Sequence, residues 1–327
     1  MPVISVENLQ KRFNLEAGFF APFGRFVYAV RGISFSIGEN ETYGLVGESG
    51  CGKTTTARLL VRMYTWDAGS VRYGKDTDVA ALSGAALKAY REKVRYIFQD
   101  PARSLNPRMT VYEVLASGYR HSSRFPGEKK AREEAARILT EVGLSPDDLE
   151  KRPSEFSGGQ RQRISIARGL LVKPELLICD EVVSALDVSI QGQILNLLLD
   201  IREKRGLSFL FIAHDLKVAC YFCDRIGVMY QGELMEEGPA ETLYRDAGHP
   251  YTRLLFSSAG GREAPVRGEG AGPPAGISPG IPGAEGCPFA PRCALAEERC
   301  FSEHPELRET EPGRRIRCFL ADGGQRA

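Results

Sequence analysis

A short glycine-rich segment offers the clearest chemistry in the sequence. Residues 47–54 read Gly-Glu-Ser-Gly-Cys-Gly-Lys-Thr. Glycines let the backbone curl with its N–H groups pointing inward, which forms a cradle for an anion such as a phosphate. In such a cradle Lys53 reaches the β- and γ-phosphates of a nucleotide, and the Thr54 hydroxyl ligates Mg²⁺. We therefore expect a nucleotide-phosphate site made of Gly47, Glu48, Ser49, Gly50, Cys51, Gly52, Lys53, Thr54 and Thr55.

The flanking residues predict that this segment lies between a strand and a helix. Residues 41–46 are typical of a buried strand, and residues 55–63 of a helix, whose N-terminus favours negative charge. A glycine-rich turn alone is often only structural. The order of strand, glycine loop and helix favours a phosphate site.

Acidic residues and a histidine follow two further predicted strands. Residues 176–180 read Leu-Leu-Ile-Cys-Asp and precede Glu181, and residues 208–213 precede His214. Because the ligands of open α/β sheets lie at the carboxyl ends of the strands, we expect these side chains beside the phosphates. There Asp180 would hold Mg²⁺, Glu181 would orient or deprotonate an attacking water, and His214 would contact the γ-phosphate. Without the glycine loop, they would be ordinary loop residues.

A second pair of glycines opens a predicted helix. Residues 157–160 read Ser-Gly-Gly-Gln and precede a helical stretch that ends at Leu171. The N-terminus of a helix offers free N–H groups to an anion. Most of residues 99–172 is predicted to be helical, including an amphipathic stretch at residues 129–143, and we assign this range to a helical subdomain.

Together these motifs closely resemble the nucleotide-binding subunit of ATP-binding cassette (ABC) transporters. The resemblance covers roughly residues 1–258. It rests, in chain order, on residues 47–54, Gln99, Ser157, Gly158, Gly159, Gln160, Asp180, Glu181, residues 184–187 and His214. It implies an α/β fold with a mixed-sheet P-loop core, an antiparallel β part and the helical subdomain.

The resemblance also implies the activity and the roles of the residues. ATP is hydrolysed with Mg²⁺, Glu181 is the catalytic base and His214 holds the γ-phosphate. Two subunits pair head to tail, so that residues 157–160 cap the nucleotide of the partner. Gln99 senses Mg²⁺ and the membrane subunit, and Asp187 communicates across the dimer. Val182 stands where the family commonly has proline; hydrolysis is still expected because Glu181 is present, with a regulatory subunit whose own site is weak as the alternative.

An aromatic side chain is expected to stack on adenine, which requires only a flat π face. Phe13, at the end of the first predicted strand, fits this role best. Tyr28 is the alternative, because an insertion at residues 14–26 separates the two. Packing in the core is the ordinary role of either ring.

Three stretches resemble one branch of the family, the oligopeptide/dipeptide and nickel importers. They are residues 99–108, 184–191 and 249–253. The aromatic insertion resembles the second of the two ATPases in such systems. The resemblance implies a related ATPase as partner, in a heterodimer or a homodimer, two membrane permease subunits, and indirectly an extracytoplasmic substrate-binding protein.

Four of the eight cysteines fall near the C-terminus, after a Gly- and Pro-rich linker predicted at residues 259–286. A segment as short as residues 287–327 has too little core to fold alone, and a cytoplasmic location argues against disulfides. We therefore expect a small module in which Cys287, Cys293, Cys300 and Cys318 bind a metal. Both a [4Fe–4S] cluster and Zn²⁺ accept four cysteines, and the resemblance favours the cluster.

The composition limits the class of protein. With 43 basic and 42 acidic residues, the chain has no overall charge that would hold nucleic acid, which disfavours a soluble ABC ATPase acting on nucleic acid or ribosomes. No apolar run reaches the length of a membrane-spanning helix, and the first residues do not read as a secretory signal. We expect a protein at the cytoplasmic face of the membrane, held there by its partners.

Overall fold

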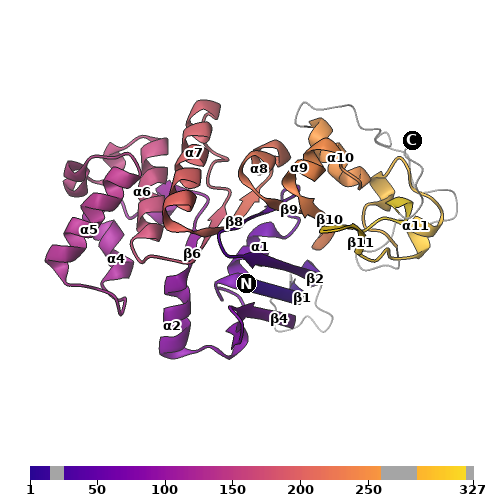
Figure 1. Ribbon diagram of the computed structural model, residues 1–327, viewed down its shortest axis with the longest axis horizontal. Coiled ribbons are helices and arrows are strands. Elements are labelled where there is room, and N and C mark those ends of the chain that lie inside the picture. Colours follow the sequence, from indigo (N-terminus) through magenta and orange to yellow (C-terminus); the bar gives the residue numbers. More distant parts are fainter. Residues whose placement is uncertain (15–25, 259–285, 322–327) are drawn as a thin grey trace.

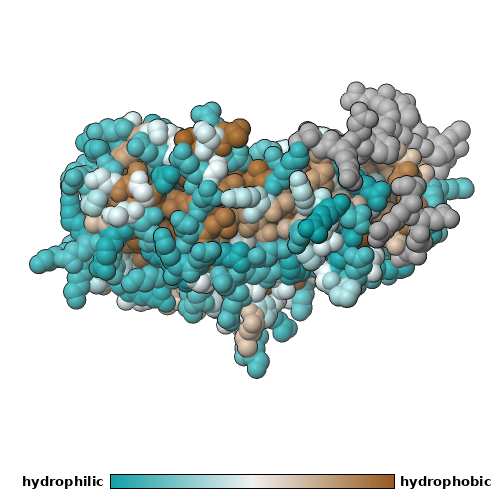
Figure 2. Space-filling view, turned by 45° about the horizontal axis from the view of Figure 1, so that its top comes forward, coloured by the Kyte–Doolittle hydropathy of each residue, from teal (hydrophilic) through white to brown (hydrophobic). Residues whose placement is uncertain are grey.

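The computed structural model describes residues 1–14, 26–258 and 286–321. Residues 15–25 of the predicted insertion at 14–26 lie outside the described residues, as does the predicted linker apart from Gly286. Within the described part, no helix is both long and apolar enough to span a membrane. Figure 2 shows a face on which hydrophobic residues form a band between hydrophilic borders.

An eight-stranded mixed sheet forms the centre of the fold (Figure 1). Its strands are β3 (Thr42–Val46), β6 (Val94–Ile97), β7 (Leu176–Asp180), β8 (Ser208–Ala213), β9 (Arg225–Tyr230), β10 (Glu233–Pro239), β11 (Arg308–Glu311) and β12 (Arg314–Ile316). In space the order is β11-β12-β10-β9-β3-β8-β7-β6. The five strands from β9 to β6 are parallel, and β10, β12 and β11 continue the sheet in antiparallel fashion. Every residue of β3, β7 and β8 is buried, which explains their continuous apolar runs.

A four-stranded antiparallel sheet packs beside the main one. It has the order β2-β1-β4-β5, with β1 (Pro2–Asn14), β2 (Phe26–Gly38), β4 (Ala68–Tyr73) and β5 (Thr77–Asp78). Successive side chains of a strand point to opposite faces. Accordingly, Leu210 and Ile212 of β8 face the core shared with this sheet, whereas Phe209 and Phe211 face the helices on the other side.

Helices cover the main sheet and form the predicted helical subdomain. The helices are α1 (Lys53–Leu60), α2 (Gly84–Lys93), α3 (Pro101–Ser104), α4 (Val111–Tyr119), α5 (Glu128–Glu141), α6 (Gly158–Leu170), α7 (Val188–Arg205), α8 (Leu216–Phe222), α9 (Ala240–Arg245), α10 (Pro250–Ser258) and α11 (Arg299–Ser302). Short 3₁₀ turns are η1 (Val79–Ala81), η2 (Pro146–Glu150), η3 (Pro153–Glu155), η4 (Ala290–Arg292) and η5 (Phe319–Ala321). The predicted amphipathic stretch is α5, which buries Ala131, Ala135, Ile138 and Leu139.

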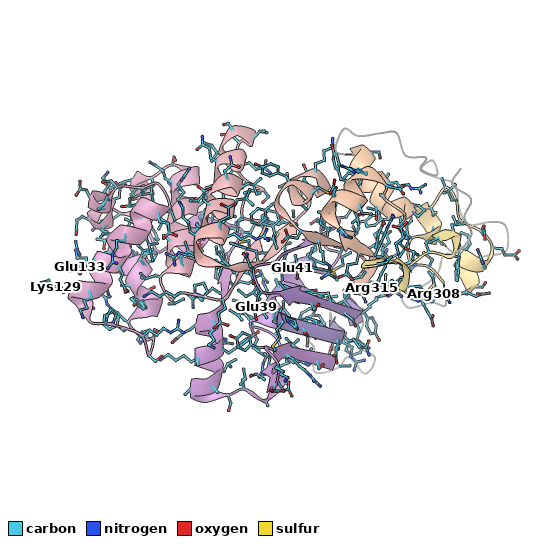
Figure 3. The ribbon with its side chains drawn as sticks, in the orientation of Figure 1. Glu39, Glu41, Lys129, Glu133, Arg308 and Arg315 are labelled. Carbon is cyan, nitrogen blue, oxygen red and sulfur yellow. The ribbon has the colours of Figure 1, made fainter. Side chains whose placement is uncertain are left out.

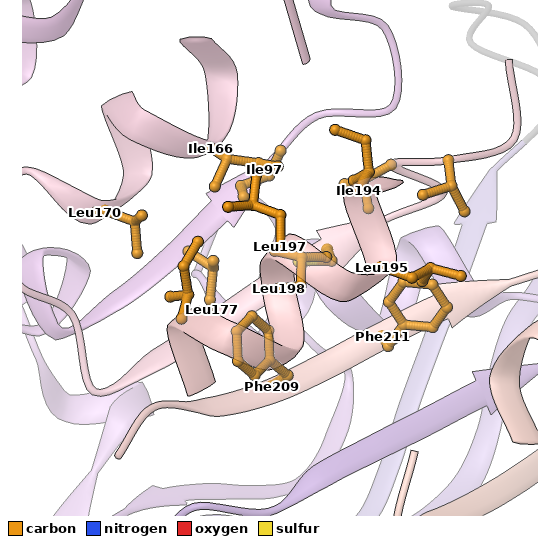
Figure 4. Close-up of a cluster of buried hydrophobic side chains, with 14 of the residues drawn as sticks. Ile97, Ile166, Leu170, Leu177, Ile194, Leu195, Leu197, Leu198, Phe209 and Phe211 are labelled. Atoms are coloured by element: carbon orange, nitrogen blue, oxygen red, sulfur yellow. The ribbon is translucent and has the colours of Figure 1, made fainter. Parts of the chain in front are cut away.

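One hydrophobic cluster joins the helical part to the sheet. Figure 4 shows side chains of α7, among them Ile194 and Leu198, packed over Leu177 of β7 and Phe209 of β8. Ile166 and Leu170 of α6 belong to the same cluster. The helical subdomain is thus anchored through α6, together with α7, on β7 and β8, the strands that end at Asp180 and before His214.

The C-terminal residues are joined to the cassette by the main sheet. Strand β12 pairs with β10, and Phe289 and Cys293 belong to the same core cluster as the cassette. Figure 3 shows Arg308 and Arg315 at the end of the molecule opposite Lys129 and Glu133. The division into residues 1–258 and 287–327 stays a prediction, but the described parts of both ranges share one sheet and one core.

Buried ion pairs explain why this junction was not evident from the sequence. Arg314 of β12 pairs with Glu236 of β10 at 3.0 Å, and both side chains are almost fully buried. Arg315 likewise pairs with Glu237. Strand β12 contains the adjacent arginines Arg314 and Arg315, and β10 is rich in glutamate. Charged residues such as these indicate exposed segments in a sequence, because buried charges are tolerated only when they are paired.

Candidate nucleotide site

Four neighbouring parallel strands bring the predicted site residues to one edge of the sheet. The loop of residues 47–52 follows β3, His214 follows β8, Asp180 and Glu181 follow β7, and Gln99 lies two residues after β6. These strands lie in the order β3-β8-β7-β6. Since they are parallel, their carboxyl ends meet at the same edge.

The loop requires glycine where its backbone passes close to neighbouring strands. A Cβ on Gly47 would lie 2.1 Å from the carbonyl oxygen of Met229, and one on Gly52 would lie 2.1 Å from that of Ala29. Gly50 and Gly52 also have positive φ angles, of 80° and 112°. Helix α1 starts directly afterwards at Lys53, and the first N–H groups of a helix have no partner within it. They are available to a phosphate.

Lys53 folds back over this loop. Its Nζ donates hydrogen bonds to the carbonyl oxygens of Gly47 at 2.7 Å and Glu48 at 2.9 Å, and the residue is only 4% exposed. The ammonium group is therefore held at the mouth of the phosphate cradle, where it can exchange these carbonyls for phosphate oxygens.

Thr54 and Asp180 form the oxygen-rich part of the site. The Thr54 hydroxyl donates to Oδ1 of Asp180 at 3.0 Å, and the Tyr96 hydroxyl donates to Oδ2. Burial and the nearby Asp180 carboxylate raise the pKa of Tyr96, so that it remains a donor. Mg²⁺ prefers oxygen ligands such as hydroxyls and carboxylates, and Thr54 and Asp180 therefore fit that ion.

Glu181 has an unusual backbone conformation and a fixed side chain. Its φ is 50°, in the left-handed region that residues other than glycine seldom adopt, and its N–H donates to the carbonyl of Ile212 at 3.1 Å. The side chain accepts a hydrogen bond of 2.7 Å from Nε2 of Gln99. The exposed His214 lines a small hollow together with Glu181 and Ser184. The predicted base, glutamine and histidine thus lie close together.

A cavity of about 450 Å³ opens over the phosphate loop. Besides Ser49, Gly50, Gly52, Lys53, Thr54, Thr55, Gln99 and Glu181, its lining includes Phe26, Val27, Tyr28, Ala29, Arg31 and Gln231. Five of these last six residues come from β2, and Gln231 comes from the turn after β9. Of the six, the sequence predicts a site role only for Tyr28. Their residue types carry no phosphate-binding signal; only strand order brings them here.

Tyr28 and Phe13 differ in their relation to this cavity. Tyr28 lines it and is 43% exposed. Phe13, which the sequence favoured for adenine stacking, is not among its lining residues, and its ring packs edge-on against Tyr64 with the centroids 5.4 Å apart. In the β1–β2 pairing, Val27 lies opposite Phe13 and Tyr28 lies opposite Arg12.

The Ser-Gly-Gly-Gln segment lies elsewhere in the chain. Ser157 caps α6: its Oγ accepts from the Gln160 N–H at 3.3 Å, and the Gln160 side chain accepts from the Ser157 N–H at 2.9 Å. A Cβ on Gly159 would lie 2.6 Å from Cγ2 of Ile190. Gly158 follows Ser157 at the start of α6, and Asp187 begins α7. None of these residues lines the 450 Å³ cavity, and Figure 1 shows α6 in the helical part, away from α1.

The four C-terminal cysteines line one small hollow with His249 and Phe289. All four are free thiols. Burial raises the pKa of Cys287 to about 12 and that of Cys318 to about 11. Among the described residues, no three Cys, His, Asp or Glu side chains converge closely enough to hold a metal ion as they stand. The thiols would have to turn toward a common centre to do so.

Comparison with known proteins places the chain in a family. The family model "ABC transporter" matches residues 30–184, and "Oligopeptide/dipeptide transporter, C-terminal region" matches residues 235–300. A putative oligopeptide transport ATP-binding protein of Bacillus subtilis, YkfD, is 44% identical over 98% of this chain and 96% of its own length. A probable peptide ABC transporter ATP-binding protein of Sinorhizobium fredii is 41% identical over 97% and 90%.

Solved structures show the same fold. The ATP-binding cassette MJ0796, in a dimeric post-hydrolysis structure with ADP and Pi, matches with a TM-score of 0.64 and 26% identity, over 72% of this chain and 98% of that one. The cbiO1 structure from Clostridium perfringens, part of an ABC transporter complex, has a TM-score of 0.64 at 24% identity and covers 75% of this chain and 91% of that one. The chain therefore belongs to the ATP-binding subunits of ABC transporters, in the branch of the oligopeptide/dipeptide transporters.

Proposed function

We propose that the chain is the ATP-hydrolysing subunit of a peptide importer. ATP hydrolysis is supported because one sheet edge brings together the phosphate loop, Thr54, Asp180, Glu181 and His214. Peptide transport is supported by the names of the similar proteins. A nickel or other small-solute importer of the same branch is the alternative. A soluble ATPase acting on nucleic acid is less well supported, because basic and acidic residues balance.

Each residue of the sheet edge has a distinct task in this proposal. The amides of residues 49–55 and Lys53 would bind the phosphates. Thr54, Asp180 and Gln99 would hold Mg²⁺, which would neutralise negative charge on the phosphates. Glu181 accepts the proton of the attacking water, and His214 orients the γ-phosphate. The hydrogen bond from Gln99 occupies Oε2 of Glu181 and leaves Oε1 to accept from a water.

We further propose that the site is completed by another subunit. Residues 157–160 do not line this chain's own nucleotide cavity, yet they form a capped helix N-terminus suited to an anion. A head-to-tail pair would bring them to the nucleotide of a related ATPase, with Asp187 at the contact. Two membrane permeases, supplied by an external binding protein, would complete the importer and hold this subunit at the cytoplasmic face.

The four cysteines are proposed to bind a [4Fe–4S] cluster, with Zn²⁺ as the alternative. They line one hollow and offer soft sulfur donors, which suit either centre. A metal would lower the raised pKa values of Cys287 and Cys318, because thiolates and not thiols are the ligands.

Replacing Glu181 by Gln should abolish turnover but not nucleotide binding. Removing a general base costs about 10²- to 10⁴-fold in rate. The measurement is phosphate release by the assembled transporter at saturating ATP, together with ATP retention. Glu203→Gln, an exposed acid of α7, is the control and should leave the rate unchanged. Turnover near the wild-type rate in Glu181→Gln would refute its role as base.

Replacing Tyr28 by Ala should weaken ATP binding, whereas Tyr28→Phe should not. Stacking on a base contributes about 1–3 kcal/mol, which corresponds to roughly 5- to 150-fold in Kd. Phe13→Ala serves as the comparison because its ring packs on Tyr64 instead. The Kd for ATP and for triphosphate alone separates a base contact from a phosphate contact. A larger loss in Phe13→Ala than in Tyr28→Ala would restore Phe13 as the stacking ring.

Anaerobically purified protein should contain about four irons and four acid-labile sulfides per chain, if the four cysteines bind a cubane cluster. Iron, sulfide and zinc analysis with the visible spectrum measures this directly, and Cys293→Ser should lose the metal while Cys220→Ser, outside the hollow, should keep it. One zinc without colour would select the alternative. Protein without either metal would refute the site.

A further inference from the structure

A hydrogen-bonded ion pair joins the cysteine-bearing C-terminal segment to the phosphate loop. Arg292, at the end of η4 and next to Cys293, donates from Nη1 and Nη2 to the two carboxylate oxygens of Glu48, both at 2.8 Å. Such a bidentate contact fixes the orientation of the guanidinium relative to the carboxylate as well as the distance between them. Glu48 follows Gly47 in the loop, so residues 244 positions apart in sequence meet at the nucleotide site.

Glu48 is held at each of its polar groups. Its N–H donates to the Tyr251 hydroxyl at 3.0 Å, and its carbonyl accepts from Lys53 Nζ at 2.9 Å and from the Cys51 N–H at 3.3 Å. The Arg292 hydrogen bonds hold the pKa of the Glu48 carboxyl below its usual value, so the side chain is ionised at neutral pH. A displacement of Glu48 would therefore move Lys53, which reaches for the phosphates.

The arginine itself is held in place by aromatic rings. Its guanidinium carbon lies 5.8 Å from the ring centroids of both Tyr230 and Phe289. Phe289 in turn packs on the buried Tyr251, with centroids 5.3 Å apart. The aromatic rings that contact Arg292 thus pack with Tyr251, whose hydroxyl accepts the hydrogen bond from the Glu48 N–H.

The backbone ties this arginine to the cysteine hollow. The N–H groups of Arg292 and Cys293 both donate to the Phe289 carbonyl at 3.0 Å, and the Cys287 N–H donates to the Cys300 carbonyl at 2.8 Å. A change in the position of the Cys287–Cys293 turn would move the guanidinium that holds Glu48.

From this geometry we infer that Arg292 is a positioning residue for the phosphate loop, acting through Glu48 on Lys53. The C-terminal segment thereby takes part in nucleotide binding without touching the nucleotide. The expected effect on ATP binding rests on the proposed ATPase function. The ordering of the phosphate loop by Arg292 rests on these contacts alone.

In the full chain, Arg292→Gln should raise the Kd and KM for ATP by roughly two- to fivefold and leave kcat at saturating ATP unchanged. The expected effect is small because the side chains of Arg292 and Glu48 are 42% and 41% exposed. Glu48→Gln should have the same effect, and the double variant should be no worse than either single one. Arg299→Gln is the matched control, because Arg299 pairs with Glu297 in the same segment at 46% and 48% exposure. It should change neither constant.

Amide hydrogen exchange of residues 47–52 without nucleotide provides a second readout. Arg292→Gln should speed amide exchange in this loop, and Arg299→Gln should not. Arg292→Lys should have an intermediate effect, because it keeps the charge but loses the bidentate contact. Wild-type protein that bound no ATP would refute the proposed function, while the exchange data would still decide on Arg292. Unchanged loop exchange in both Arg292 variants, or additive losses in the double variant, would overturn the inference.

Discussion

The direction and order of four strands control the whole site. Because β3, β8, β7 and β6 are parallel neighbours, whatever follows each of them is delivered to one edge of the sheet. This edge receives an anion cradle, a hydroxyl, two acids, a histidine and a glutamine. Burial of β3, β7 and β8 on both faces keeps these positions rigid, and the helical part is fastened to the same strands through α6 and α7.

The same architecture separates the nucleotide cavity from the Ser-Gly-Gly-Gln segment. One side of the 450 Å³ cavity is formed by the phosphate loop and β2, whereas residues 157–160 lie on the separate helical part. In the proposed head-to-tail pair, ATP would lie between the phosphate loop of one subunit and residues 157–160 of the other. The C-terminal segment adds a third connection, from the cysteine hollow through Arg292 to Glu48.

The sequence predicted the parts that local patterns encode. Residues 47–54 between a strand and a helix, the apolar runs ending at Asp180 and before His214, and the amphipathic α5 all carry periodic or glycine signals. It could not predict the contacts made by strand order alone, such as Tyr28 and Gln231 in the cavity. Nor could it show that Arg314 pairs with Glu236 and thereby joins the C-terminal strands to the main sheet, since that depends on long-range pairing of charges.

We propose that this chain binds ATP with its sheet edge and lends residues 157–160 to another subunit. The most direct test is calorimetric titration of Mg²⁺ and ATP into the isolated chain, at concentrations where it is monomeric, with Lys53→Ala and Ser157→Arg. The account predicts that Lys53→Ala abolishes measurable binding and that Ser157→Arg leaves the Kd unchanged, because Ser157 does not line this cavity. Equal losses in both variants would contradict it.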